Sequence, residues 1–273
     1  MIWRKNEESM LDEVREVCAR EARRSDSEAQ SLYQDRLREQ LERKLTQPYC
    51  IPYVEGGRKH LRKWVNSSQI YVDSNFTPYH HSVEEIVERA VEKRADIESL
   101  YCEMNQLYLD EYPFPGGRKV YFVSQNGHHR RLEFACIGLP KLEAYVQEAQ
   151  GDVWRYFFEP SRPDVIKVFR WFLAVGLLDN VEIDYRSRSI LIEDGGSLGA
   201  WLLPDSQRCI GLGSLLSEIR LRADSISSHV EIDDRILNIL NSKVRRYLAV
   251  QVVDLKFRCH RFLKNLVTLL HSL

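Results

Sequence analysis

The spacing of hydrophobic and polar positions changes from a strand period to a helix period and back over residues 119–147, in the middle of the chain. A β-branched and aromatic run from Val120 to Ser124 predicts a strand. Helical periodicity follows over residues 128–137, between Gly127 and Gly138, which predict a sharp turn and a helix end. Leu142 to Val146 then predicts a second strand. The stretch is therefore expected to form a unit of the β-α-β kind.

The helix predicted over residues 128–137 carries apolar and charged residues on different sides. Arg130, Arg131 and Glu133 are expected largely on the side opposite the apolar residues. The helix begins where backbone N–H groups, two histidines and two arginines converge, which favours an anion site. The apolar side is expected to hold Leu132, Phe134, Ala135 and Cys136.

The first 46 residues predict two charged helices. The first has one apolar face, and the second has N-capping residues at 25–27 and a stripe at Leu37, Leu41 and Leu45. The pattern favours a helical hairpin packed on the core or on a second copy, and the alternative is a partner-binding or dimerising arm. The face of the first helix consists of Met10, Leu11, Val14, Val17 and Cys18.

The segment between these regions has weaker patterns. Residues 48–63 are expected to be irregular or hairpin-like, and Gln69 to Val72 predicts a short strand. A capping box at Ser82 begins a helix. Residues 96–112 are expected to continue as a helix or an irregular segment.

Beyond residue 150 the pattern predicts a helix over 164–178 and then three short strands. The strands are expected at 181–185, 189–193 and 198–203, with a hairpin turn at 194–196. The tail from Ile232 to Leu273 is strongly helical, with a wide apolar face and a basic side. That side fits a solvated surface of a helix pair, or a surface for nucleic acid or an acidic partner.

Composition and charge argue against several classes of protein. The chain has 273 residues and a net charge of −1, so it has no overall basic field for DNA or an anionic membrane. Six scattered cysteines, with no CxxC pair, indicate neither a zinc ribbon nor a disulfide framework. The N-terminus lacks a signal-peptide core, and no apolar run could span a bilayer. These features predict a cytoplasmic protein without a membrane partner.

The sequence Gly127-His128-His129-Arg130, followed by a short helix, Gly138, Pro140 and a strand, resembles the nucleotide-binding core of the ParB/sulfiredoxin-like superfamily. The local likeness is greatest to the ADP-dependent free-serine kinases of that superfamily. It covers residues 118–147 well and 64–117 faintly. The resemblance implies that phosphate is held by Asn126, Gly127, His128, His129, Arg130 and Arg131.

The resemblance also implies a nucleotide, ATP, ADP or CTP, with or without magnesium, and a small-molecule acceptor. Serine kinases carry an Asp before the Gly and a catalytic Glu in an earlier loop. Here Asn126 replaces the Asp, and the loop offers His80 and His81, which are the candidates for the catalytic base. No resident metal site is predicted, because adjacent histidines usually cannot bind one ion together.

The expected fold is α/β (α+β), a ParB/sulfiredoxin-like core with additions at both ends. The domains predicted are a helical N-terminal arm at 1–47, the nucleotide-binding core at 48–150, and an α+β extension at 151–273. The leading function is a kinase-like phosphotransferase acting on a small molecule. The alternative is a non-catalytic, nucleotide-gated regulator that binds DNA or a protein partner, with DNA disfavoured by the net charge. A homodimer through the N-terminal or C-terminal helices stays open.

Overall fold

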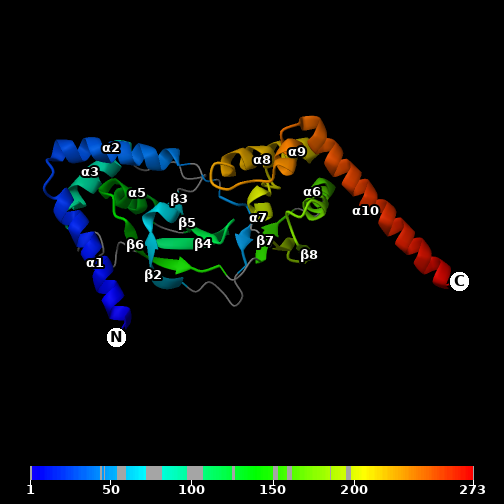
Figure 1. Ribbon diagram of the computed structural model, residues 1–273, viewed down its shortest axis with the longest axis horizontal. Helices are drawn as coiled ribbons and strands as arrows, with labels where there is room; N and C mark the ends of the chain where they lie inside the picture. Colours follow the sequence, from blue (N-terminus) through cyan, green and yellow to red (C-terminus); the bar gives the residue numbers. More distant parts are fainter. Residues whose placement is uncertain are drawn as a thin grey trace. The chain divides into compact units, whose positions relative to one another are not determined.

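The chain has an α+β fold with two separate β-sheets (Figure 1). The computed structural model describes residues 2–43, 45, 47–53, 60–71, 82–96, 107–124, 127–149, 153–158, 162–184, 186–194 and 198–272, with side chains from 11 to 261. It divides into two compact units. The first unit comprises residues 1–45, 56–112 and 119–149, and the second comprises 46–55, 113–118 and 150–273. Among the described residues, no helix is long and apolar enough to cross a membrane.

The first unit contains a five-stranded sheet in the order β2-β6-β4-β5-β3. β2 pairs antiparallel with β6, whereas β4 pairs parallel with β6 and β3 parallel with β5. The tip of the β4–β5 hairpin, residues 113–118, belongs to the second unit. The strands are β2 His60–Asn66, β3 Ile70–Tyr71, β4 Tyr108–Phe114, β5 Arg118–Val123 and β6 Lys141–Gln147, and the 3-10 turn η1 Ser67–Gln69 precedes β3.

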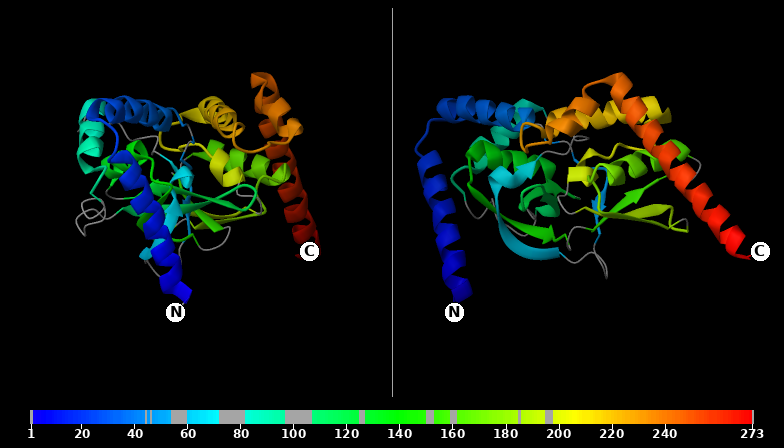
Figure 2. Two further views of the ribbon diagram at one scale, coloured as in Figure 1. Left: turned by 60° about the vertical axis from the view of Figure 1, so that its left-hand side comes forward. Right: turned by 45° about the vertical axis from the view of Figure 1, so that its right-hand side comes forward.

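Helices cover this sheet, and α2, α3 and α5 lie together on one of its faces (Figures 1 and 2). The helices are α1 Ile2–Glu21, α2 Asp26–Glu42, α3 Val83–Lys93 and α5 His128–Ile137. Val14 of α1 and Tyr33 and Leu37 of α2 are fully buried in the core that these helices share with the sheet. The N-terminal helices therefore pack on the core. Residues 1–45 share a compact unit with residues 56–112 and 119–149.

Helix α5 has the bounds that its flanking glycines predict, and two of its charged residues are buried. Arg131 and Glu133 are 3% and 2% exposed. The reason is that α2, α3 and α5 all pack against one another, so α5 is covered by two helices as well as by the sheet. Glu133 is compensated by Lys93, whose Nζ lies 2.6 Å from the Glu133 carboxylate, and by Arg89 at 3.9 Å.

Strand β4 was not predicted, and it changes the topology. It lies between β5 and β6, so the strands on either side of α5 are not neighbours and do not form a β-α-β pair. The polar residue Glu111 in this strand is buried. Its carboxylate receives Lys63 at 2.7 Å and Lys119 at 2.8 Å, which offsets the cost of burying its charge.

The second unit has an antiparallel sheet in the order β1-β7-β9-β8. The predicted strand at 198–203 is wrong, since Leu198–Leu202 forms α7. The backbone N–H of Ala200 donates to the Asp194 carboxylate at 2.9 Å, and Gly199 packs against the carbonyl of Leu177. The remaining elements are β1 Ile51–Pro52, β7 Val153–Phe157, β8 Asn180–Asp184, β9 Ser189–Glu193, α6 Pro163–Ala174, α8 Gly211–Ile226, α9 Asp234–Leu240 and α10 Lys243–Ser272.

Candidate functional site

The start of α5 has the local geometry that the sequence predicts. Gly127 is the N-cap residue with φ 114°, a left-handed conformation that a side chain would strain. His128, His129 and Arg130 form the first turn and are half-buried. The predicted residues His80, His81 and Asn126 lie outside the described residues, so their role in this site stays a prediction.

Arg131 departs from the rest of the predicted set, because its side chain enters the interior of the first unit. Its Nη2 donates to the Gln40 side chain at 2.7 Å and to the Ile70 carbonyl at 2.5 Å. Its Nη1 is buried and has no hydrogen-bond partner in the part of the chain that the structure describes. Burial, and then the neighbouring charge of Arg43, lowers the pKa of Arg131 to about 9. The fold therefore holds a guanidinium away from water with one of its donor groups unused.

Arg131 lines a pocket of about 360 Å³ between α2 and α5. From α5 and its C-terminal end, Arg131, Ala135 and Gly138 face it at positions i, i+4 and i+7, which lie on one side of a helix. Ala135 has a small side chain, and at Gly138 the Arg36 guanidinium lies only 2.9 Å from the position that a Cβ would take. Helix α2 and its end contribute Arg36, Glu39, Gln40 and Arg43, and the other lining residues are Ser67, Ser68, Leu139, Pro140 and Leu142.

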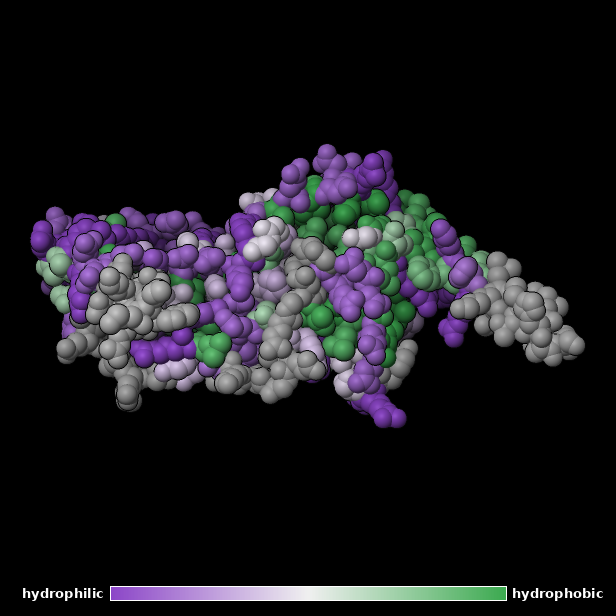
Figure 3. Space-filling model, turned by 60° about the horizontal axis from the view of Figure 1, so that its bottom comes forward, coloured by the Kyte–Doolittle hydropathy of each residue, from purple (hydrophilic) through white to green (hydrophobic). Residues whose placement is uncertain are grey.

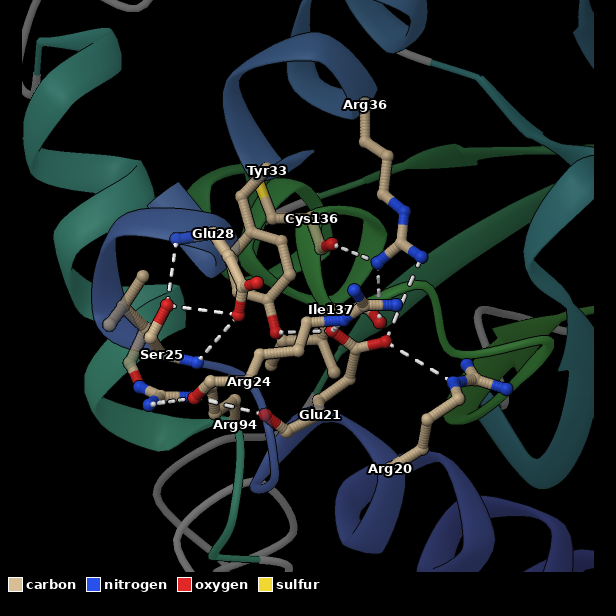
Figure 4. Close-up of polar contacts among 11 residues, drawn as sticks. Arg20, Glu21, Arg24, Ser25, Glu28, Tyr33, Arg36, Arg94, Cys136 and Ile137 are labelled. Atoms are coloured by element: carbon tan, nitrogen blue, oxygen red, sulfur yellow. Dashed lines mark hydrogen bonds and ion pairs between the residues drawn. The ribbon is translucent and has the colours of Figure 1, made fainter. Parts of the chain in front are cut away.

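The three arginines of the pocket are not equivalent. Arg36 Nη1 donates to the last carbonyls of α5, those of Cys136 at 2.8 Å and Ile137 at 2.9 Å, and so caps the negative end of that helix. Arg36 Nη2 also lies 3.8 Å from Glu21 (Figure 4). Arg36 is therefore already compensated by its own chain.

The buried Glu21 fixes Arg36 through a wider network. Its carboxylate accepts from Tyr33 Oη at 3.1 Å and from Arg24 Nε at 2.9 Å, and Arg20 approaches at 3.3 Å (Figure 4). Burial, followed by the charge of Glu21, raises the pKa of Tyr33, so its hydroxyl stays a donor. This network is structural, and it holds one wall of the pocket in place.

Arg43 and Arg131 differ from Arg36, because neither has a carboxylate within 4.0 Å among the described residues. Arg43 donates to Gln40 at 3.1 Å and to the Ser68 carbonyl, and its guanidinium lies 4.6 Å from the Tyr71 ring centre. Glu39, the carboxylate among the described lining residues, is exposed. The pocket thus contains two guanidinium groups that repel each other and have no carboxylate partner among the described residues. A bound anion would attract both and offset their repulsion.

Comparison with protein-family models, with curated proteins and with solved structures finds no match to this chain. The likeness to the ParB/sulfiredoxin-like superfamily therefore stays a prediction. Among the described residues, no cluster of three or more histidines, cysteines, aspartates or glutamates could hold a metal ion.

Sequence reasoning placed Arg131 in the anion site but missed the pocket that it lines. The signal was a polar stripe, Arg36, Gln40 and Arg43, at i, i+4 and i+7 on a helix whose opposite face is apolar. On its own the stripe is typical of a solvated face. Its meaning depends on α5 lying beside it with Ala135 and Gly138 turned toward it, which requires the tertiary structure.

Proposed function

We propose that the first unit binds a small phosphate-bearing ligand of the nucleotide class, and that Arg131 and Arg43 hold its phosphate in the pocket between α2 and α5. The observation that carries this proposal is the buried guanidinium of Arg131, which lines this pocket and has no carboxylate within 4.0 Å among the described residues. Leaving a buried donor or charge unsatisfied is costly, so a fold that keeps one beside a cavity favours a ligand that completes it.

Phosphate fits this site better than a carboxylate does. It carries more negative charge at neutral pH, and its oxygens match the planar fork of a guanidinium. Two arginines that repel each other gain together from one multivalent anion. Ser67 and Gln40 add neutral hydrogen-bonding groups at the wall. The volume of about 360 Å³ lies at the lower end of the range of small-molecule pockets, about 300–1,000 Å³.

The nucleotide class comes from the sequence. Arg131 directly follows the Gly-His-His-Arg segment at 127–130 that resembles a nucleotide-binding turn, and it lies between that turn and the pocket that it lines. Binding is proposed here, whereas phosphoryl transfer stays a prediction that depends on His80 and His81. The non-catalytic regulator also stays open, because the described lining supplies anion-binding groups and only an exposed carboxylate, Glu39, as a candidate base.

The test is a calorimetric titration of the full chain with phosphate, pyrophosphate, AMP, ADP, ATP and CTP, with and without magnesium, at constant ionic strength. The expected result is binding that tightens with phosphate charge. Arg131→Met should weaken it by about 10-fold or more, which is the loss of one charge-assisted contact of ~1.5–3 kcal/mol.

Two further variants give this titration its controls. Arg38→Met removes a charge from α2 outside the pocket, where Arg38 pairs at the surface with Asp35, and it should leave affinity unchanged. Arg130→Ala tests the start of α5 instead of the pocket. If Arg130→Ala abolishes binding while Arg131→Met does not, the ligand lies at the helix N-terminus and the pocket assignment is wrong. If no phosphate compound binds, the function proposed is wrong.

A further inference from the structure

The C-terminal helix α10 carries an apolar face that its own chain leaves uncovered. Residues Arg246, Val250 and Asp254, spaced by four, are buried against the second unit, where α10 packs on α6, α8 and α9. On another side, Leu248, Val252 and Leu255 are 55%, 62% and 63% exposed. Figure 3 shows hydrophobic residues at the surface of the second unit beside the described part of α10.

Beyond Asp254 the helix projects from its unit, although Phe257 still faces the Arg170 guanidinium of α6 at 5.9 Å. Every residue from Leu255 to Arg261 is exposed, although these seven residues cover almost two turns. Helices without tertiary contacts are marginally stable in water, so a projecting helix of this kind needs a partner. In Figure 1, α10 extends away from the other helices of the second unit.

The spacing of the uncovered residues identifies the partner. Leu248, Val252, Leu255 and Cys259 are separated by four, three and four residues, and the sequence continues this repeat with Phe262, Leu266 and Leu269. Alternating steps of four and three are the heptad pattern of a coiled coil. Within the heptad, leucine takes the d position at 248, 255 and 269, and β-branched Val252 takes an a position. Within parallel coiled coils, valine at a with leucine at d favours two strands; Phe262 takes the remaining d position, and Cys259 and Leu266 take the other a positions.

The charges of α10 are compatible with a second copy of the same helix. In a parallel pair, each g residue lies opposite the e residue five positions later on the partner helix. These pairs are Gln251 with Lys256, Arg258 with Leu263, and Asn265 with Leu270, so no two like charges face each other. The basic residues therefore do not oppose self-association along this seam.

We infer that the chain forms a parallel homodimer through the seam of α10 that starts at Leu248 and includes Val252, Leu255 and Cys259. An apolar groove of about 300 Å³ between α8 and the start of α10, which Leu248 also lines, lies at the first layer of this seam. The seam belongs to the second unit and is independent of the ligand pocket in the first.

Sedimentation equilibrium of the full chain over micromolar concentrations tests the inference. The wild type should be a dimer, and Leu255→Asp should weaken it by at least about 100-fold, because each chain would bury an unpaired carboxylate. The monomer should keep its stability, since Leu255 is exposed. The matched control is Phe257→Asp, two residues away and outside the seam. Phe257 lies 5.9 Å from the Arg170 guanidinium, so an aspartate is tolerated there, and the dimer should persist.

Cys259 reports the orientation of the helices. In a parallel, in-register pair the two Cys259 side chains meet in one a layer, so a short bis-maleimide should link the dimer, and Cys259→Ser should abolish the link. A monomer at all concentrations would overturn the inference. Equal effects of Leu255→Asp and Phe257→Asp would also overturn it, because they would indicate a broad apolar surface and not a seam. Binding of the monomer to anionic vesicles through α10 would overturn it as well. A dimer without the Cys259 link would overturn the parallel arrangement.

Discussion

Replacing Arg131 with methionine is expected to stabilise the ligand-free protein, which is the opposite of what most buried substitutions do. Typical point mutations destabilise by about 1 kcal/mol. Arg131 is a special case, because it is a charge that is almost completely buried and has no carboxylate partner among the described residues. Methionine fills a similar volume with a flexible, uncharged side chain.

The magnitude follows from two opposing contributions. A fall in the pKa of Arg131 from 12.5 to about 9 corresponds to a cost of ~5 kcal/mol for keeping the side chain charged in the folded state. Removing the guanidinium leaves the Ile70 carbonyl without this donor, which costs ~1–3 kcal/mol. Gln40 keeps a donor, because Arg43 also reaches its side-chain oxygen. The net expectation is a gain of ~2–4 kcal/mol for Arg131→Met.

The assay is hydrogen exchange of the α2 and α5 amides in a buffer without multivalent anions, because these helices report on the first unit alone. The pKa of Arg131 also fixes how the stability difference between variant and wild type changes with pH. The cost of the charged arginine is fully present below the folded pKa of about 9 and is lost as pH rises from there toward 12.5. The advantage of Arg131→Met should therefore shrink above pH 9. A loss of several kcal/mol in the variant would show that the hydrogen bonds of Arg131 hold the fold, and it would refute this reasoning.

Three further predictions concern the scaffold. Burial raises the pKa of Glu111, but hydrogen bonds from Lys119 and Lys63 outweigh this effect and hold the pKa below its usual 4.5. The stability that Glu111 contributes should therefore be lost as pH falls below about 4.5. In urea denaturation, Glu111→Gln should show a flatter pH dependence in this range than the wild type. Gly199→Ala should cost ~3 kcal/mol in urea denaturation, because its Cβ would lie 2.1 Å from the Leu177 carbonyl oxygen, and an unchanged midpoint would contradict the close packing of α7. Ser25→Ala removes the capping box of α2 and should cost ~1 kcal/mol, visible as faster exchange in the first turn of α2 and not in α8.

The elements that the local sequence could predict are those whose ends are marked by capping residues. Helix α5 has glycines at both ends, and both adopt left-handed conformations, so its bounds at His128 and Ile137 followed from the sequence. The capped helices beginning after Ser25 and Ser82 were predicted for the same reason. In each case a side chain or a glycine satisfies the helix end locally, without help from distant residues.

The elements that were missed depend on distant partners. β4 carries Asp110, Glu111 and Pro113, which are depleted in strands, and Glu111 is tolerated because Lys63 and Lys119 reach it from other strands. The apolar run at Leu198–Leu202 fits a strand or a helix, and the Asp194 cap and the contact of Gly199 with Leu177 decide for the helix. The burial of Arg131 likewise follows from α2 lying over α5, which no local pattern reveals.

The central claim is that an anionic ligand occupies the pocket between α2 and α5. Ala135→Leu tests it most directly, because leucine keeps the helix propensity of α5 and leaves every charge in place while filling part of the pocket. The measurement is a calorimetric titration of wild type and variant with ADP and with pyrophosphate. We expect the wild type to bind and Ala135→Leu to lose at least about 10-fold in affinity, ~1.4 kcal/mol. Equal affinity in both proteins, or no binding to the wild type, would contradict it.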